Sequence, residues 1–215
     1  MILHEVEQGS DEWRRLRLGR PTASEFDRIL TPTGALSKQA EGYMYRLAAE
    51  RFLRMPYDEL DPPTQKASDR AAVQRGKKLE HDAALAYEFE SGLSLQTAGF
   101  ATTDDGRVGA SLDRRVRGTD GAVEIKCPAA ATHIGYLDTG FGRDYWLQVQ
   151  GQMLVCDLAW VDRVSYYPGL PLAVERAERD EAFIERLRAA LAQFCDNLDA
   201  LTERLRALGA IGAED

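Results

Sequence analysis

Cysteine, long apolar runs and a basic leader are scarce or absent in this chain. Its 215 residues contain three cysteines, Cys127, Cys156 and Cys195. Widely spaced thiols in odd number favour reduced side chains over a disulfide framework, a zinc site or an iron–sulfur cluster. No stretch approaches the length of a membrane span, and the first residues, MILHE, lack the basic and then apolar pattern of a secretory signal. We therefore expect a cytoplasmic protein with no membrane contact.

Net positive charge is also missing. The chain has 27 Lys and Arg residues against 35 Asp and Glu residues, which gives a formal net charge of −8, whereas proteins that bind polyanions are typically basic. The distribution is uneven, because positions 66–78 hold five basic residues and one acid while positions 175–215 hold ten acids and six arginines. A local basic surface on an acidic body would suit an enzyme that moves along a polyanion without gripping it tightly.

The overall composition, 44% hydrophobic and 29% charged residues, is typical of a globular protein. The length suits a single domain over residues 1–215, and the hydrophobic periodicity predicts an α/β fold with a central mixed sheet flanked by helices. The predicted helices are residues 36–54, 69–91, 143–156 and 181–208. The predicted strands are residues 93–103, 121–126, 160–167 and 172–176, and residues 55–68 are predicted as a loop.

Two acidic residues in the middle of the chain carry the first functional signal. Asp113 ends a strand-like run, and Glu124 is followed two positions later by Lys126 in the segment GAVEIK. The two-residue period of a strand places Glu124 and Lys126 on one face, while Val123 and Ile125 point into an apolar interior. An ordinary hairpin with a surface Glu–Lys pair would give the same pattern, so the pattern alone leaves both interpretations open.

Phosphodiester hydrolysis explains why these residue types belong together. The reaction needs a hard cation such as Mg²⁺, held by a few carboxylate or carbonyl oxygens with water left on it, to polarise the phosphate and acidify a water. Asp113 and Glu124 are suited to hold such an ion. A protonated Lys126 cannot be a ligand, but its ammonium could orient the attacking water or neutralise charge that develops on the phosphorane.

Two predicted helices each contribute one more polar candidate. Glu80 lies on the helix predicted over 69–91, where it could also simply pair with Lys77 one turn earlier. Gln148 lies among large apolar residues on the helix predicted over 143–156. Because buried polar groups need partners, Gln148 has either a backbone partner or a ligand in the cleft.

The order of these residues resembles the PD-(D/E)xK nuclease superfamily, and their surroundings are similar to its phage lambda exonuclease branch, the viral recombinase exonucleases. The similar segments are EWRRLRLGRPTAS at residues 12–24, GASLD at 109–113, EIKCP at 124–128 and QVQGQM at 148–153. Several motifs in a fixed order are more specific than one. The resemblance implies a restriction-endonuclease-like core and a metal-dependent deoxyribonuclease.

The resemblance also implies a metal centre. Its ligands would be Asp113, Glu124 and the backbone carbonyl of Ile125, with Glu80 in or near the metal shell. The ion would be Mg²⁺, with Mn²⁺ as a substitute. Lys126 would then contact the nucleophile.

A second group of residues is implied for the DNA end. Gln148 would line the active site, and Arg17, Ser24 and Ser111 would bind the 5′-phosphate, a role to which a planar guanidinium and two hydroxyls are suited. The family can carry a further arginine shortly after the Lys-Cys-Pro, where this chain reads AAATH at 129–133. The phosphate pocket would be weaker for that reason, or His133 would partly substitute.

The residues of the N-terminal segment also have plain structural interpretations. Arg14, Arg15, Arg17 and Arg20 could form an exposed helical face. Thr22 or Ser24 could cap a helix that follows. A cap and a phosphate site are compatible, since the first amides of a helix are free to bind an anion.

The sequence and the resemblance together predict a Mg²⁺-dependent 5′–3′ exonuclease on double-stranded DNA ends that generates single-stranded 3′ overhangs for phage-type homologous recombination. The resemblance further implies a homotrimeric ring around the DNA and a single-strand annealing protein as partner. One alternative is a restriction- or repair-type endonuclease on the same core, which would cleave closed circular DNA. Another is a non-catalytic DNA-end-binding recombination protein, whose signature would be a lost ligand.

Overall fold

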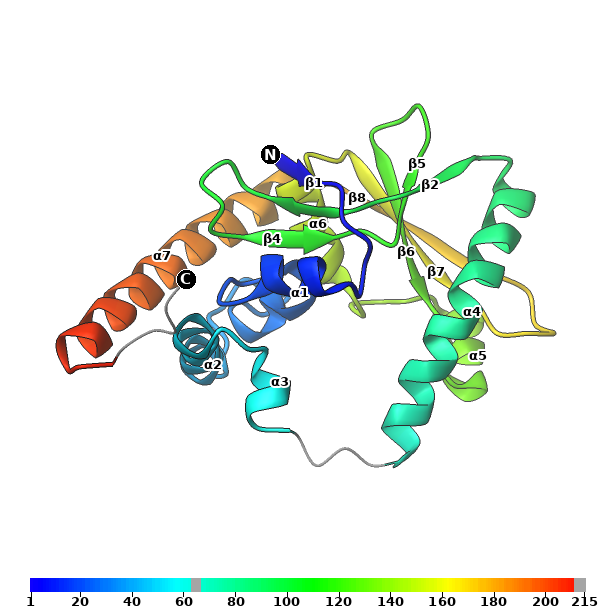
Figure 1. Ribbon diagram of the computed structural model, residues 1–215. Coiled ribbons are helices and arrows are strands. Elements are labelled where there is room, and N and C mark those ends of the chain that lie inside the picture. Colours follow the sequence, from blue (N-terminus) through cyan, green and yellow to red (C-terminus); the bar gives the residue numbers. More distant parts are fainter. Residues whose placement is uncertain (63–66, 211–215) are drawn as a thin grey trace.

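Two β-sheets form the framework of the part of the chain that the computed structural model describes, residues 1–62 and 67–210 (Figure 1). The larger sheet has the strand order β2-β5-β6-β7-β8, in which β6 and β7 are parallel and the other neighbours are antiparallel. The smaller sheet has the antiparallel order β1-β3-β4. The strands are β1 (Ile2–His4), β2 (Leu95–Thr97), β3 (Phe100–Thr102), β4 (Gly109–Ser111), β5 (Arg114–Val116), β6 (Gly121–Lys126), β7 (Trp160–Ser165) and β8 (Ala173–Glu178). The predicted mixed sheet is confirmed.

Helices cover both faces of the larger sheet (Figure 1). They are α1 (Asp11–Arg17), the 3-10 helix η1 (Ala23–Arg28), α2 (Ala40–Leu53), α3 (Tyr57–Leu60), α4 (Ala67–Ser91), α5 (Ala130–Thr139), α6 (Trp146–Cys156) and α7 (Glu181–Ala207). Helix α4 packs on β6 and β7 from one side, and α6 packs from the other, where it also contacts η1 and α7. The helices predicted over 69–91 and 181–208 are therefore confirmed to within two residues.

Strand β6 is buried on both faces. Ala122 belongs to the larger apolar core with α6 and α7, whereas Val123 and Ile125 belong to a smaller core with α4. The predicted inward direction of Val123 and Ile125 is confirmed. The opposite face of the strand is covered as well, since Glu124 is only 3% exposed. This burial rules out a surface Glu–Lys pair.

The strand predicted over 93–103 is in fact two strands of different sheets. Strand β2 pairs with β5, and β3 pairs with β1 and β4, so the chain changes sheet at Ala98 and Gly99. A Cβ atom at Gly99 would lie 2.0 Å from the carbonyl oxygen of His4. The break therefore falls where the backbone at the end of β1 approaches too closely for any side chain.

Two predicted helices begin later than their apolar pattern suggests. The helix predicted over 36–54 begins at Ala40, and the helix predicted over 143–156 begins at Trp146. The second delay follows from Tyr145, whose φ of 59° is left-handed and cannot belong to a right-handed helix. The loop predicted over 55–68 contains the one-turn helix α3 and ends where α4 begins at Ala67.

Helix α7 anchors the larger core along one side of the molecule (Figure 1). The Asp180 side chain caps it by accepting a hydrogen bond from the Phe183 amide at 2.9 Å. Its buried apolar face includes Phe183, Leu187, Leu191 and Leu198, each of which contributes about 1.5–3 kcal/mol by leaving water. None of the described helices is both long and apolar enough to cross a membrane. The three cysteines are free thiols, as predicted.

Candidate active site

Asp113 and Glu124 meet because β5 and β6 form an antiparallel pair. Arg114 is paired with Val123 in that ladder, which brings the preceding Asp113 beside the residue that follows Val123. The Asp113 carboxylate accepts a hydrogen bond from the Ile125 amide at 2.7 Å. Two acidic side chains separated by ten residues are thus held at one place by the strand register.

Three donors surround the buried Glu124 carboxylate. Its Oε1 accepts from Lys126 Nζ and from Gln148 Nε2, each at 2.6 Å. Its Oε2 accepts from Gln152 Nε2 at 2.6 Å. A buried carboxylate is costly unless it is hydrogen-bonded, and these contacts provide that compensation. Gln148 therefore has a partner, but it is the Glu124 side chain and neither of the two that were predicted, a backbone group or a ligand.

Gln152 links this carboxylate to strand β4. Its Nε2 also donates to the backbone carbonyl of Ser111 at 3.0 Å, while its Oε1 is buried without a partner. Reversing the amide would set its oxygen against the Glu124 carboxylate, so the orientation is fixed. Gln152 lay inside one of the motif segments but was not assigned a role; its spacing of four residues from Gln148, which places both on one helix face, was the available signal.

The electrostatics of the site are unbalanced toward negative charge. Burial, and then the charge of Glu124, raise the pKa of Asp113 well above its usual value. Burial acts to lower the pKa of Lys126, but the carboxylates of Glu124 and Asp113 outweigh it and raise that pKa. Two carboxylates therefore share one ammonium in a poorly solvated place. A divalent cation would relieve that repulsion, and hard oxygen donors are the ligands Mg²⁺ prefers.

Glu80 is held by a different partner from the one expected on the helix. Its Oε1 accepts from Arg114 Nη1 at 2.9 Å rather than from Lys77, and Arg114 also donates to the backbone carbonyl of Asp113. Among the side chains that the structure describes, those of residues 1–62 and 74–210, no three or more His, Cys, Asp and Glu are grouped as a metal site would require. The role of Glu80 in or near the metal shell stays a prediction, and Arg114 was missed.

The three residues predicted for the DNA end are brought into one neighbourhood. Arg17 Nη2 donates to Thr22 Oγ1 at 3.1 Å and to Ser24 Oγ at 3.3 Å. Trp13 Nε1 donates to Ser111 Oγ at 2.9 Å, and the Arg17 guanidinium lies over the Trp13 ring at 4.4 Å. Trp13 thus connects Ser111 to Arg17. Arg14 and Arg15 are exposed on α1, as a solvated helical face would be, whereas Arg17 is half-buried.

Neither Thr22 nor Ser24 caps a helix with its side chain. Thr22 stands at the N-cap position of η1, but its hydroxyl makes no capping hydrogen bond and instead accepts from Arg17. Ser24 lies inside η1 and is exposed. Both hydroxyls are therefore turned toward the guanidinium, where an anion could bind them.

The suggestion that His133 partly takes the place of the missing basic residue is wrong. The His133 side chain is completely buried, with Nδ1 2.8 Å from Ser165 Oγ and Nε2 3.0 Å from the Pro171 carbonyl oxygen. Both ring nitrogens are engaged between α5 and the β7–β8 connection, so neither can reach a phosphate. No element was predicted for residues 129–133, so the sequence gave no sign of this burial.

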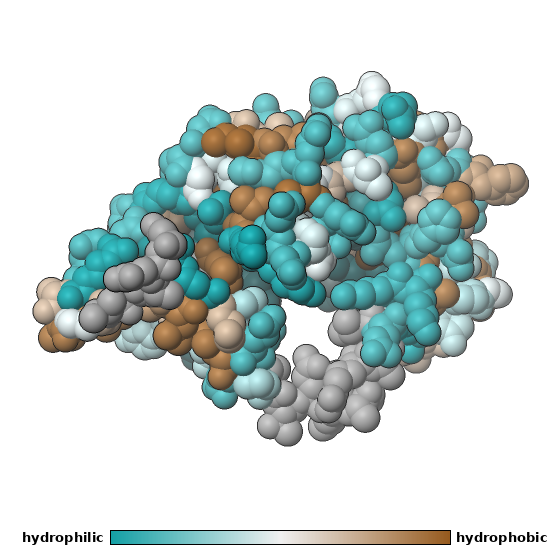
Figure 2. Space-filling model, in the orientation of Figure 1, coloured by the Kyte–Doolittle hydropathy of each residue, from teal (hydrophilic) through white to brown (hydrophobic). Residues whose placement is uncertain are grey.

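A cleft of about 1120 Å³ opens beside the acidic pair. Its lining includes Trp13, Lys77, Glu80, Asp113 and Arg114. On the face shown in Figure 2, the surface is hollowed between the α1–α3 region and α4. Asp113 thus faces a space that a large substrate can enter.

The described basic side chains of the stretch 66–78 do not line a single cavity. Lys66 lies outside the described residues, and the side chain of Arg70 is likewise not described. Lys77 lines the cleft, whereas Arg75 and Lys78 line another cavity of about 600 Å³ together with Tyr167. The described part of the stretch therefore supplies only Lys77 to the acidic pair's cleft.

The Tyr145 ring packs against the Lys126 ammonium. The Lys126 ammonium lies 4.5 Å from the centre of the Tyr145 ring, a favourable cation–π arrangement. Tyr145 holds that place through its left-handed backbone immediately before α6. Such a conformation is costly for a residue with a side chain and is concentrated at functional sites.

Comparisons with known proteins agree with this geometry. The profile of the YqaJ-like viral recombinase domain family matches residues 12–159. An alkaline exonuclease, LHK-Exo from Laribacter hongkongensis, has 31% identity and a TM-score of 0.78 over 94% of this chain and 98% of that chain. LHK-Exo in complex with dAMP gives a TM-score of 0.77 at 31% identity, with the same shares covered. No curated protein matches the chain.

A more distant structure shares the fold alone. A phage-related exonuclease from Haemophilus somnus 129PT has 15% identity and a TM-score of 0.65 over 86% of this chain and 96% of that chain. The predicted restriction-endonuclease-like core, a mixed sheet flanked by helices, is confirmed by these structural matches.

Proposed function

Since the chain belongs to the YqaJ-like viral recombinase domain family and is a DNA exonuclease, we propose that it requires Mg²⁺ and degrades one strand of duplex DNA from its 5′ end. The observation that carries this proposal is the double contact of Gln152, which joins Glu124 to the backbone of Ser111. One amide thereby sets the acidic pair beside the residues suited to a terminal phosphate. That arrangement favours cleavage near a strand end.

The metal would be held by Asp113, Glu124 and the backbone carbonyl of Ile125, with Mn²⁺ as a substitute. When bound, such an ion polarises the scissile phosphate and acidifies a water. Lys126 remains protonated, because the two carboxylates raise its pKa. Its ammonium can therefore donate to the attacking water or to the phosphate oxygens, while Gln148 and Gln152 hold the Glu124 carboxylate in place.

Arg17, Ser24 and Ser111 would bind the 5′-phosphate. The Arg17 guanidinium already donates to Ser24, and its stacking on Trp13 fixes its plane. A planar guanidinium and hydroxyl groups match the oxygens of a phosphate. Retention of this phosphate during cleavage would set the 5′ to 3′ direction.

The experiment compares linear, nicked and covalently closed circular duplexes with Mg²⁺, with Mn²⁺ and with EDTA. We expect metal-dependent loss of linear DNA, release of label from the 5′ end before the 3′ end, and an intact closed circle. Cleavage of the closed circle would favour the endonuclease alternative. Early release of a 3′ label would contradict the direction of degradation.

The assembly is the remaining part of the proposal. A homotrimeric ring around the duplex would explain how an acidic protein stays on DNA, because a closed ring encloses the duplex and does not need tight electrostatic binding. The 3′ overhangs would pass to a single-strand annealing protein. Light scattering should give a trimer, and resection should continue in the presence of a DNA trap. A monomer at working concentrations, or resection that stops after a few nucleotides, would contradict the ring.

A further inference from the structure

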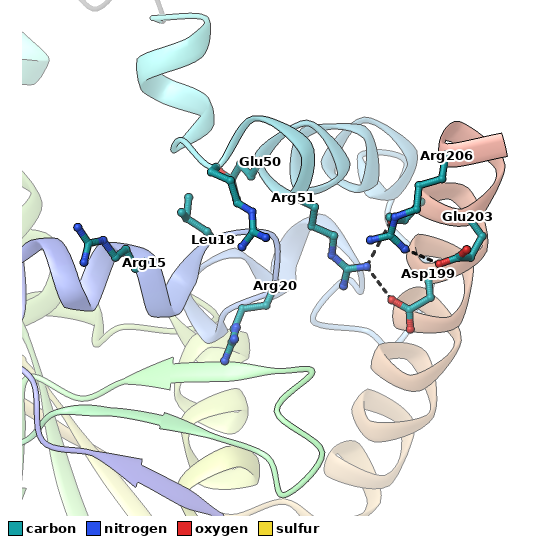
Figure 3. Close-up of a pocket in the computed structure, with 10 residues that line it drawn as sticks. Arg15, Leu18, Arg20, Glu50, Arg51, Asp199, Glu203 and Arg206 are labelled. Atoms are coloured by element: carbon teal, nitrogen blue, oxygen red, sulfur yellow. Dashed lines mark hydrogen bonds and ion pairs between the residues drawn. The ribbon is translucent and has the colours of Figure 1, made fainter. Parts of the chain in front are cut away.

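A cavity lined by several arginines lies on the side of α1 toward α2 and α7 (Figure 3). It measures about 710 Å³ and is bordered by the end of α1, the last turn of α2 and the C-terminal half of α7. Five arginines and three acids line it together with two uncharged residues: Arg15, Arg20, Arg51, Arg54, Arg206, Glu50, Asp199, Glu203, Leu18 and Thr202. We call it the arginine pocket.

All three acids of the arginine pocket have partners. Asp199 accepts from Arg51 and from Arg107, each at 2.7 Å. Glu203 is paired with Arg206 on α7. The Glu50 carboxylate accepts two backbone amides, those of Gly19 and Tyr57, each at 2.9 Å. These carboxylates are therefore engaged by groups other than Arg20.

Arg20 is the side chain left without compensation. Its Nε is buried and has no hydrogen-bond partner in the described structure, and none of its other side-chain nitrogens makes a hydrogen bond or ion pair there. Burial and the positive charge of Arg51 both lower the pKa of Arg20. Both side chains line the arginine pocket, and an anion bound there would supply the partner that Arg20 lacks.

The pocket is also preformed. Arg51 is fixed by hydrogen bonds from Nε to the Gly19 carbonyl oxygen at 2.8 Å and from Nη1 to Asp199. A Cβ atom at Gly19 would lie 2.3 Å from Arg51 Cγ, and the φ of Gly19 is +63°. Glycine is therefore favoured at this turn, which precedes Arg20 and lies directly against the stem of the Arg51 side chain.

We infer that the arginine pocket binds a phosphodiester group of the DNA backbone, separate from the 5′-terminal phosphate. Guanidinium groups recognise phosphate oxygens, and the lining contains no aromatic side chain on which a base or a free nucleotide could stack. A neighbouring cavity of about 350 Å³ contains Arg17 and Thr22 and shares Leu18, Arg20 and Glu50 with the arginine pocket. The two cavities are thus adjacent, which suits successive phosphates of one nucleic acid.

The inference rests on the proposed action on DNA, and binding without hydrolysis tests it. Fluorescence anisotropy in EDTA would compare wild type, Arg20→Gln, Arg15→Gln and Arg20→Lys on 5′-phosphorylated and 5′-hydroxyl duplexes over a salt series. Arg20→Gln should weaken binding about tenfold on both duplexes and should reduce the magnitude of the salt slope by about one. Arg20→Lys should retain part of the affinity. Thermal unfolding would establish that each variant is folded, and exposed Arg15 gives a second variant that does not disturb the core.

The matched control is Arg117→Gln, which removes one exposed positive charge from the turn between β5 and β6. The inference would be overturned if Arg20→Gln, Arg15→Gln and Arg117→Gln had equal effects. It would also be overturned if millimolar inorganic phosphate or dAMP competed with DNA and Arg20→Gln abolished that competition, because the site would then bind a small anion. Unchanged DNA binding by Arg20→Gln and Arg15→Gln would also overturn it and would leave an acidic protein partner to be tested. A wild type that binds no duplex would instead refute the proposed function together with this inference.

Discussion

Two buried acidic groups on strands of the same sheet differ in their balance of charge. Asp162 on β7 is 4% exposed and accepts two hydrogen bonds from Arg176, at 2.8 and 2.9 Å, and one from the Tyr87 hydroxyl at 2.7 Å. Asp113 and Glu124, by contrast, share the single ammonium of Lys126. The Asp162 group is complete as it stands and serves the fold.

The difference shows which physical property identifies the active site. Burial of a carboxylate occurs in both places, and so does hydrogen bonding. Of the two groups, only the Asp113–Glu124 pair carries an excess of negative charge, which adds to burial in raising the pKa of Asp113. A protein maintains such a repulsion at a cost in stability, so it marks a place where a cation is expected.

The largest expected effect comes from removing either member of the pair. Asp113→Ala or Glu124→Ala should lower the rate of hydrolysis by about a thousandfold or more, because a metal ligand is lost, while DNA binding and folding persist. Asp162→Ala should do the opposite: it should cost about 2–4 kcal/mol in the free energy of unfolding, because Tyr87 and Arg176 lose their partner, and leave the rate per folded molecule unchanged.

Hydrolysis rates and denaturant unfolding of all three variants would check this comparison. Wild-type rates from Asp113→Ala or Glu124→Ala would refute the metal assignment. A catalytic loss in Asp162→Ala that equals theirs would refute the division into a catalytic and a structural group.

Lys126→Ala separates catalysis from metal binding. We expect it to lose most of the activity, because the proposed role of its ammonium is with the water and the phosphate. Mg²⁺ should still raise the melting temperature of this variant, as it does for any protein whose folded state alone binds the ligand, whereas Asp113→Ala should lose that shift. Loss of the Mg²⁺ shift in Lys126→Ala as complete as in Asp113→Ala would contradict separate roles.

Gln152→Met tests whether an amide positions the catalytic carboxylate. We expect a 10- to 100-fold lower rate and a higher Mg²⁺ concentration for half-maximal rate, since groups that orient a metal ligand typically have effects of that size. Gln150→Met is the matched control two residues away on α6, because Gln150 bonds only Glu178 and Asp180 backbone groups. That control should lose stability and keep its metal dependence. Unaltered metal dependence in Gln152→Met would leave Gln152 a packing residue only.

The smallest expected effect concerns the strand end. Removal of the 5′-phosphate should slow the wild type several-fold, and Arg17→Ala should erase the difference between 5′-phosphate and 5′-hydroxyl duplexes, because the charged contact is lost. Arg28→Ala, which removes a guanidinium paired with Glu25 on η1, should preserve the difference. Equal wild-type rates on the two ends would remove the pocket.

Much of the site was predictable because its residues lie in short motifs. The alternation in GAVEIK correctly placed Val123 and Ile125 toward one core and Glu124 with Lys126 on the other face. The need of Gln148 for a partner was also correct. The segments that carried the resemblance identified the family, because several of them occur in a fixed order.

Contacts between distant segments were not predictable. His133 looked available for a phosphate, yet α5 carries it into the interior beside Ser165. Glu80 had a plausible partner one turn away, but Arg114 on β5 takes it. The apolar run over 93–103 gave no indication that it serves two sheets.

The sequence by itself determined which residues share a strand or helix face. It also determined that two carboxylates, a lysine and glutamines stand in short motifs along the chain. Those features follow from covalent geometry and are local. The tertiary structure alone decided that Gln152 joins Glu124 to Ser111 and that Arg51 packs against the Gly19 turn. Such contacts depend on how helices pack on sheets, since residues far apart in the chain meet only when the whole core has formed.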